Sequence, residues 1–141
     1  MIRYLLDTNV ISETARPKPD ANVIRWIGQL SSITLPAVGI YEVAAGIQRL
    51  AAGKRREFLE EWFAELLASD WDVLPFDCEA ALTCAVLEAE ARHRRRTIEQ
   101  RDLLILAIAK SRDLVVATRN VAHFRGLGVP VYDPFSDAQI I

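Results

Sequence analysis

Asp7 is the first acidic residue of the chain and lies among other polar groups. It directly follows the short apolar run Tyr4–Leu6 and precedes Thr8 and Asn9. A carboxylate beside two more short polar side chains can present several oxygen atoms to a hard cation. Taken alone, Asp7 has the simpler interpretation of a helix N-cap, because Asp favours that position and a helix is predicted to start here.

Asp102 is harder to explain as an ordinary surface residue. It lies in the first turn of a predicted helix whose next residues, Leu103–Ala109, are apolar without interruption. Such a helix is hydrophobic on all sides and should be buried, and an Asp is rarely buried without a partner. A metal ion would explain the position, and so would an ion pair with Arg101 or Arg119. Both interpretations stay open at this point.

Glu42 is the weakest of the acidic candidates. On a helix it points away from the apolar stripe of Ile40, Val43 and Ile47. Most such Glu side chains are simply solvated. Gly46 lies one turn further on, and its bare backbone leaves room for a ligand to approach the carboxylate.

The other residue types that support catalysis form poorer patterns. His93 and His123 have no partner at metal-ligand spacing, so we expect surface or structural roles for them. No nucleophile elbow, P-loop or dinucleotide-binding glycine motif occurs. The segment Arg92–Arg96 holds four Arg and His93, and it is the best phosphate-binding candidate, although a charge run of this kind is more often only solvated.

Size, composition and charge indicate one globular domain with local charge features. The 141 residues are 51% hydrophobic and 26% charged, and the net charge of −2 excludes a general attraction to nucleic acid or membranes. Fourteen of the seventeen basic residues are Arg, which suits bidentate contacts with phosphate or carboxylate. No Lys or Arg occurs from Phe58 to Glu90, whereas Arg92 to Arg101 contains five Arg. Electrostatic recognition should therefore be local.

The sequence favours a cytoplasmic protein without disulfides. No apolar run approaches the roughly 20 residues of a membrane span, and Asp7 interrupts the start too early for a signal peptide. Cys78 and Cys84 are predicted to lie in one helix, where six residues rise about 9 Å, too far for a disulfide. We expect two reduced thiols in the core.

The order of the predicted elements indicates an α/β fold. We expect a three-layer α/β/α domain with a central, mostly parallel sheet of four to five short strands. The predicted strands are Tyr4–Leu6, Ile33–Pro36, Val73–Phe76, Leu114–Ala117 and Val129–Tyr132. The predicted helices are Thr8–Thr14, one capped by Asp20, Gly39–Ala52 closed by Gly53, Arg55–Ala68, one from Asp77 to about Arg92, and Glu99–Arg112.

Functional groups in such sheets collect beyond the carboxyl ends of the strands. Asp7 follows the first strand directly, and the polar stretch Thr118-Arg119-Asn120 follows the fourth. This rule therefore marks the two segments as candidates for the functional site.

Five motifs occur in a distinctive order along the chain: Leu6–Glu13, Tyr41-Glu42, Asp102–Ile105, Ala117–Asn120 followed by Phe124, and Tyr132–Phe135. In this order and spacing they resemble the PIN domain, specifically the VapC/FitB-like toxins of bacterial toxin–antitoxin pairs. The resemblance spans Met1 to about Phe135, which predicts a single PIN domain over residues 1–135 and a C-terminal tail over 136–141.

The resemblance implies that Asp7, Glu42 and Asp102 form the acidic catalytic and metal site. Asp7 and Asp102 would be the main ligands of Mg²⁺ or Mn²⁺, and Glu42 a third ligand or the group that orients the attacking water. Family members commonly have a fourth acidic residue where this chain has Asn120. Thr8, Asn9 and Thr118 are expected to support the site.

The implied activity is metal-dependent hydrolysis of RNA phosphodiester bonds, with Arg residues at the rim holding flanking phosphates. The implied partners are the RNA substrate and a small cognate antitoxin, in a homodimer or higher toxin–antitoxin assembly. Electrostatics adds a detail. A pocket of clustered carboxylates is best silenced by a planar cation, so we expect an antitoxin Arg to enter it, with an apolar segment packing beside Trp26 or Trp62.

Two alternatives remain. The loss of a charge at Asn120 leaves open a catalytically weak PIN-like module that acts by docking a partner. A haloacid-dehalogenase-like phosphatase would need a second Asp two residues after the first, where this chain has Asn9, and it is therefore disfavoured.

Overall fold

The computed structural model of the chain describes residues 1–136 and 140–141. Part of the predicted C-terminal tail, residues 137–139, lies outside the described residues. The strands are β1 (Tyr4–Leu6), β2 (Thr34–Pro36), β3 (Asp72–Leu74), β4 (Val115–Ala117) and β5 (Val131–Tyr132). The helices are α1 (Thr8–Glu13), α2 (Ala21–Gln29), α3 (Ala37–Gln48), α4 (Lys54–Ala68), α5 (Cys78–His93), α6 (Gln100–Ser111) and α7 (Val121–Phe124).

The five strands form one parallel sheet in the order β3-β2-β1-β4-β5. The chain builds outward from β1 in one direction and then returns to add β4 and β5 on the other side. The switch point therefore falls between β1 and β4, where Leu5 pairs with Val116. Ligand sites of open α/β sheets lie at such a point, beyond the carboxyl ends of the strands. The α/β prediction is confirmed, with a sheet that is parallel throughout.

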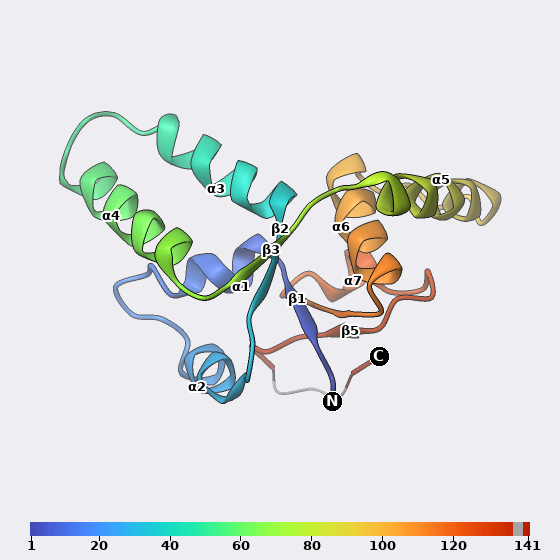
Figure 1. Cartoon of the computed structure of the whole chain (residues 1–141), viewed down its shortest axis with the longest axis horizontal. Coiled ribbons are helices and arrows are strands. Elements are labelled where there is room, and N and C mark those ends of the chain that lie inside the picture. The colour runs from blue at the N-terminus through green and yellow to red at the C-terminus, as the bar shows by residue number, and fades with distance from the viewer. Residues whose placement is uncertain (137–139) are drawn as a thin grey trace.

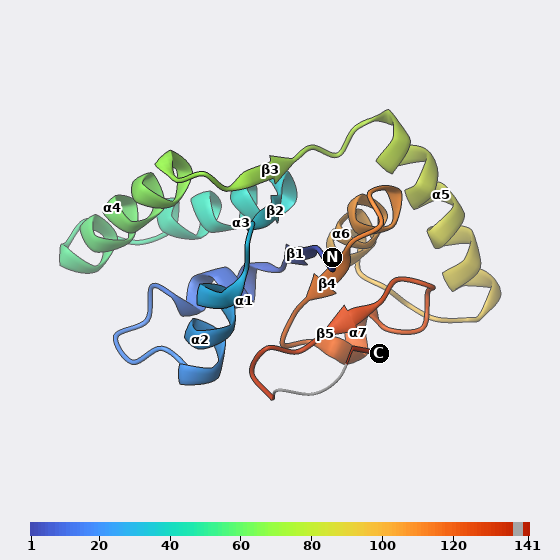
Figure 2. The ribbon, with the colours of Figure 1, turned by 60° about the horizontal axis from the view of Figure 1, so that its bottom comes forward.

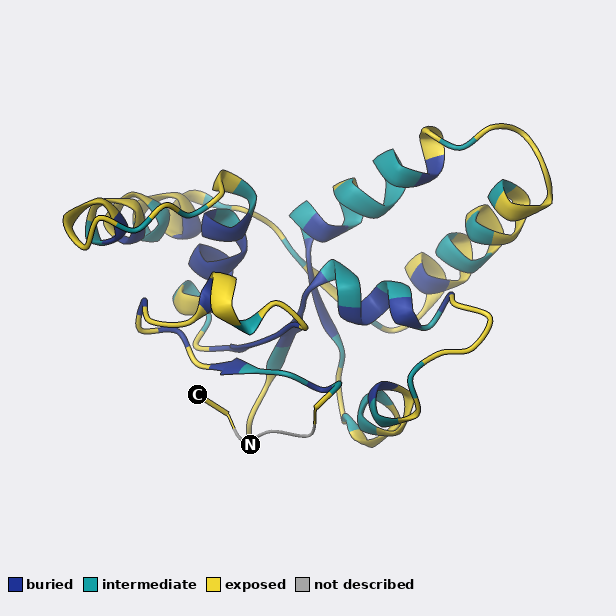
Figure 3. Ribbon diagram, turned by 180° about the vertical axis from the view of Figure 1, so that it is seen from behind, coloured by how far each residue is buried: buried dark blue, intermediate teal, exposed yellow. Residues whose placement is uncertain are grey.

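Neighbouring residues of the central strands face opposite sides of the sheet, so two cores form. Leu5 and Val116 belong to the core under α5, α6 and α7. Leu6 and Ala117 belong to the core on the other side, with buried residues of α1, α2 and α4. Because strand side chains alternate in direction, these short strands are buried on both faces. Figure 3 shows the buried strands between helices whose outer surfaces are exposed.

The helices divide into two groups around the sheet. Figure 1 shows α3 and α4 on one side of the central strands and α5 and α6 on the other, with α1 and α2 near the first group. The view in Figure 2 confirms this separation. Helix α6 is buried along most of its length, from Asp102 to Ala109, as its uninterrupted apolar sequence predicts.

Several local predictions need correction. Helix α3 ends at Gln48, and Gly53 is the N-cap of α4, where its φ of 155° suits a residue without a Cβ. Helix α7 was not predicted, because four residues give no periodic pattern. Cys78 is exposed at the start of α5, so the expected burial of both thiols is wrong there, although both cysteines are free. Among the described residues, no helix combines the length and apolar character needed to cross a membrane.

Candidate active site

Asp7 lies directly after β1 and is fully buried. Its Oδ1 accepts a hydrogen bond of 2.7 Å from the backbone N–H of Thr8, so Asp7 is the N-cap of α1. Its Oδ2 accepts a hydrogen bond of 2.8 Å from the hydroxyl of Thr118. The N-cap interpretation is therefore correct, and the same carboxylate also belongs to a cluster of functional groups.

Glu42 reaches this cluster from α3. Its Oε1 accepts a hydrogen bond of 2.9 Å from the hydroxyl of Thr8, and its Oε2 accepts one of 2.6 Å from Nε of Arg101. The side chain keeps 28% of its accessible surface. Glu42 is therefore held toward the sheet end and is not a freely solvated surface residue.

Asp102 reaches the cluster from the first turn of α6, and its side chain is 5% exposed. Its Oδ1 accepts a hydrogen bond of 2.7 Å from Nη1 of Arg101. Its Oδ2 lies 3.7 Å from Nδ1 of His123, whose side chain is mostly exposed. Arg101 is thus the partner that the burial of Asp102 requires, whereas Arg119 lies elsewhere, over the ring of Phe135 at 4.7 Å.

Arg101 connects the three carboxylates to one another. Its Nε and Nη1 bind Glu42 and Asp102, and its Nη2 donates to Asp7 and, at 3.4 Å, to the hydroxyl of Thr8. Burial lowers the pKa of this guanidinium, but hydrogen bonds and charge from Glu42, Asp7 and Asp102 outweigh it and raise the pKa above its usual value. Arg101 is therefore a permanent cation at the centre of the acidic cluster.

The remaining predicted residues support this centre. The hydroxyl of Thr118 accepts the backbone N–H of Asn120 at 3.0 Å and the side-chain amide of Asn9 at 3.5 Å. Asn9 Oδ1 accepts the backbone N–H of Arg119 at 3.2 Å. Asn120 is exposed and is the N-cap residue of α7. The segments that follow β1 and β4 are therefore bonded to each other.

The oxygen donors of the site are of the type that binds a hard divalent cation, but they are arranged around the guanidinium of Arg101. The converging donors are carboxylate and hydroxyl oxygens, which Mg²⁺ and Mn²⁺ prefer. Within residues 1–136 and 140–141, no three His, Cys, Asp or Glu side chains are placed closely enough to hold an ion together. The three carboxylates instead surround the guanidinium of Arg101.

Two clefts adjoin the cluster. One, of about 230 Å³, lies between α1, α3 and α4, and its wall includes Glu42, Gly46, Arg55 and Trp62. The open side of Gly46 therefore does border a cleft next to Glu42. A second cleft, of about 290 Å³, lies beside Asp102 and is also lined by His123, Arg96 and Glu99.

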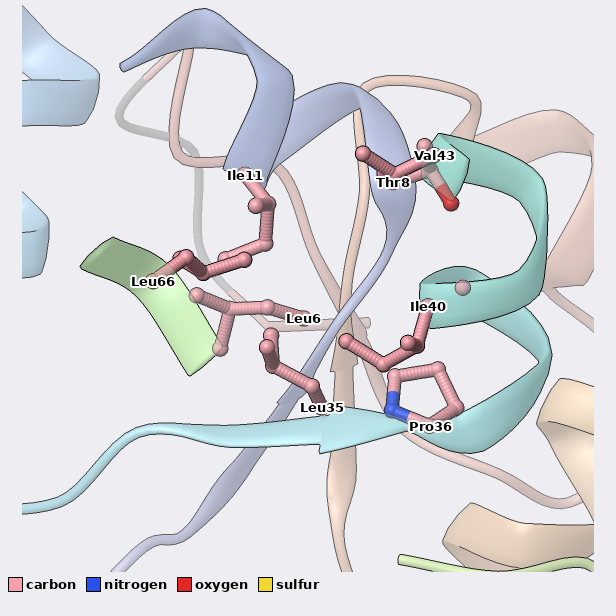
Figure 4. Close-up of a pocket in the computed structure, with 9 residues that line it drawn as sticks. Leu6, Thr8, Ile11, Leu35, Pro36, Ile40, Val43 and Leu66 are labelled. Carbon is pink, nitrogen blue, oxygen red and sulfur yellow. The ribbon is translucent and has the colours of Figure 1, made fainter. Parts of the chain in front are cut away.

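A small apolar pocket underlies the first cleft. Figure 4 shows Leu6 and Leu35 from the strands facing Ile11 and Ile40, with Thr8 and Val43 at one edge of the group. Thr8 thus borders apolar packing on one side, while its hydroxyl serves Glu42 on the other. This packing fixes the position of the residue that follows Asp7.

The sequence patterns do not reveal two of the contacts near the site. His123 approaches Asp102 only because α7 packs against α6. Arg96, part of the predicted phosphate-binding run, donates to the backbone oxygens of Ala122 and His123, each at 3.0 Å, and also to that of Arg125. Arg96 therefore fixes α7. A helix of four residues carries no periodic signal that would have revealed either contact.

Comparisons with known proteins identify the family of the chain. The family model described as PIN domain matches residues 4–127. The chain is 36% identical over 139 residues to Toxin FitB of Neisseria gonorrhoeae, covering 94% of this chain and 99% of that protein. It is 35% identical over 138 residues to VapC ribonuclease Y4jK of Sinorhizobium fredii, covering 95% and 99%. Its fold is similar to the crystal structure of FitAcB from Neisseria gonorrhoeae, with a TM-score of 0.86, 34% identity and coverage of 94% and 98%.

Proposed function

Because this chain belongs to the PIN-domain family, among the VapC/FitB toxins of toxin–antitoxin systems, we propose that it is a metal-dependent ribonuclease neutralised by a cognate antitoxin. The observation that carries the proposal is the convergence of Asp7, Glu42 and Asp102 at the switch point of the sheet. These residues come from three separate elements, and each is held by further hydrogen bonds or burial. A relative with a similar sequence is named a VapC ribonuclease.

In this proposal Asp7 and Asp102 hold Mg²⁺ or Mn²⁺, and Glu42 is a third ligand or orients the attacking water. When bound, the cation would lower the pKa of that water and neutralise charge on the phosphate. Thr118 and Thr8 fix the carboxylates through the hydrogen bonds of 2.8 Å and 2.9 Å described above, and Asn9 connects Thr118 to the loop after β4. Asn120 lies near this network as a neutral oxygen donor.

The negative charge of the site affects the binding of RNA. Three carboxylates repel an RNA phosphate, so binding at this pocket depends on added positive charge. Arg55 in the wall of the first cleft is placed to contact flanking phosphates. The expected location is the cytoplasm, where RNA and an antitoxin are both available, and we expect the toxin to self-associate within the complex.

A cleavage assay tests the proposal. Purified protein is incubated with a mixture of single-stranded RNAs in Mg²⁺, in Mn²⁺ and in EDTA. We expect metal-dependent cleavage that Asp7→Asn abolishes, while Asp70→Asn, at an exposed position before β3, serves as the matched control and leaves it intact. Binding of RNA without cleavage in any metal would favour the alternative, a catalytically weak PIN-like module that acts by docking a partner.

A further inference from the structure

We infer that Arg101 is a positioning residue whose guanidinium holds the three site carboxylates together until a divalent cation displaces it. This inference rests on the proposed metal-dependent function and adds a competitor for the metal within the chain itself. Its basis is the way in which the oxygen atoms of the site are shared.

Each carboxylate turns one oxygen toward Arg101. Asp7 uses Oδ1, Glu42 uses Oε2 at 2.6 Å from Nε, and Asp102 uses Oδ1 at 2.7 Å from Nη1. All three guanidinium nitrogens are therefore engaged, each by a different residue. The bonds are charge-assisted and are among the stronger hydrogen bonds in proteins.

The second oxygen of each carboxylate faces a different group. Asp7 Oδ2 accepts from Thr118, and Glu42 Oε1 accepts from Thr8. Asp102 Oδ2 lies 3.7 Å from His123. For Asp7 and Glu42, the oxygen without a neutral donor is thus the one that Arg101 occupies, whereas Asp102 Oδ2 has no hydrogen bond at 3.7 Å. A cation bound by all three carboxylates and the present guanidinium position exclude each other.

The charge balance favours the exchange. Three negative carboxylates against one guanidinium leave a formal charge of −2 in the cluster. A divalent cation in place of the guanidinium would leave −1. A guanidinium stays protonated in proteins, so Arg101 must move aside as a cation. Its side chain is 27% exposed, so one edge already faces solvent.

The principal test compares Arg101→Ala with the unmodified protein in two measurements. Calorimetric titration with Mn²⁺ should show about tenfold tighter binding by the variant, because no internal cation competes for the same oxygens. Urea unfolding in EDTA should show a less stable variant, because the carboxylates then repel one another without a counter-ion. Saturating Mn²⁺ should restore most of that loss, since a ligand that binds the folded state stabilises it.

Arg119→Ala is the matched control. It also removes one Arg close to the end of β4, but Arg119 contacts the ring of Phe135 and no site carboxylate. We expect its Mn²⁺ affinity to change by less than about threefold, since only screened, longer-range charge is lost. A purely general effect of positive charge would move both variants equally and would overturn the inference.

A second measurement follows the response of the unmodified protein to metal. The Nε–H of Arg101, bonded to Glu42, should give a distinct, slowly exchanging signal in ¹⁵N NMR without metal. Titration with Mg²⁺ should shift this signal or broaden it by solvent exchange as the site fills. Assignment of the signal uses its absence in Arg101→Lys.

The outcomes separate this inference from the proposed function. If the protein cleaves RNA with Mg²⁺, but Arg101→Ala binds Mn²⁺ no more tightly and the NMR signal stays in place at saturation, the inference is wrong and the function stands. If neither the protein nor Arg101→Ala binds Mn²⁺, both are wrong, and Arg101 is a permanent structural counter-ion.

Discussion

The hydroxyl of Thr118 donates a hydrogen bond of 2.8 Å to Oδ2 of Asp7, and the two residues directly follow β4 and β1. A backbone bond of 2.9 Å from Asp7 N–H to the oxygen of Ala117 continues the pairing of these strands. Both residues are fully buried. The bond therefore fixes the direction of the Asp7 carboxylate where the strand order reverses.

Removal of this hydroxyl should cost stability. Thr118→Val keeps the shape of the side chain but leaves the buried Oδ2 of Asp7 without its donor, and we expect the free energy of unfolding to fall by about 1–3 kcal/mol. Urea unfolding in EDTA measures the change. Thr118→Ser keeps the donor and should lose much less. Equal losses in the two variants would assign the effect to packing.

The fold follows closely from the sequence because β1 and β4, in the middle of the sheet, are short, apolar and largely buried on both faces. All five strands lie within two residues of the predicted positions. The switch point could not be derived, since the strand order depends on which helix crosses which face. The predicted end of α3 at Ala52 was wrong, since the helix ends at Gln48. Gly53 closes no helix and instead begins α4, because the chain after α3 makes a loop before the next helix.

The three carboxylates of the cluster could be named from the sequence, but the cation that lies between them, Arg101, could not. Asp102 required a partner, and the sequence left a metal ion, Arg101 and Arg119 open. The choice depends on contacts across 94 residues to Asp7 and 59 residues to Glu42, which no local pattern contains. Only the positions of α3 and α6 relative to β1 bring Arg101 between the carboxylates.

Neutralising Asp102 should cost activity and little stability. Asp102→Asn keeps an oxygen that can accept the bond from Arg101, and it relieves repulsion among the carboxylates, so we expect the free energy of unfolding in EDTA to stay within about 1 kcal/mol. RNA cleavage in Mg²⁺ should fall at least about a hundredfold, because a proposed metal ligand is lost. A variant that unfolds would identify Asp102 as part of a structural ion pair only.

Restoring a carboxylate at Asn120 should strengthen metal binding. Asn120→Asp adds a full negative charge in the loop after β4, where the backbone N–H of residue 120 is bonded to Thr118, and the steric change is small. Calorimetric titrations with Mg²⁺ and Mn²⁺ should show higher affinity than in the unmodified protein. Unchanged affinity would place residue 120 outside the metal shell.

The charge of Asp77, which caps α5 and pairs with Arg112, should make stability depend on pH. The backbone N–H of Ala80 and, next among the favourable effects, the charge of Arg112 hold the pKa of Asp77 below its ordinary value of 3.8. The ionised form is thus favoured in the folded state. Its contribution is complete above the unfolded pKa and is lost as the pH falls through the lower, folded pKa.

Comparison with Asp77→Asn isolates this effect, because Asn also caps a helix well. Urea unfolding should show the unmodified protein as the more stable of the two at pH 7. The difference should shrink progressively once the pH is below 3.8. A difference that stays constant down to the acid limit would mean that the charge of Asp77 plays no part in it.

The position of Arg101 changes the expectation for the antitoxin. An antitoxin Arg was predicted to enter the carboxylate pocket, but the chain's own guanidinium already binds Asp7, Glu42 and Asp102. An inserted Arg must therefore displace Arg101, as a metal ion must.

If an antitoxin Arg displaces Arg101, Arg101→Ala should bind the cognate antitoxin about tenfold more tightly than the unmodified toxin, and excess Mg²⁺ should weaken both complexes. Binding measured by surface plasmon resonance at several Mg²⁺ concentrations tests this, with Arg119→Ala as the control. If the antitoxin affinity changes neither with Arg101→Ala nor with Mg²⁺, the antitoxin binds in the clefts beside the site, and Arg101 stays bound to the carboxylates.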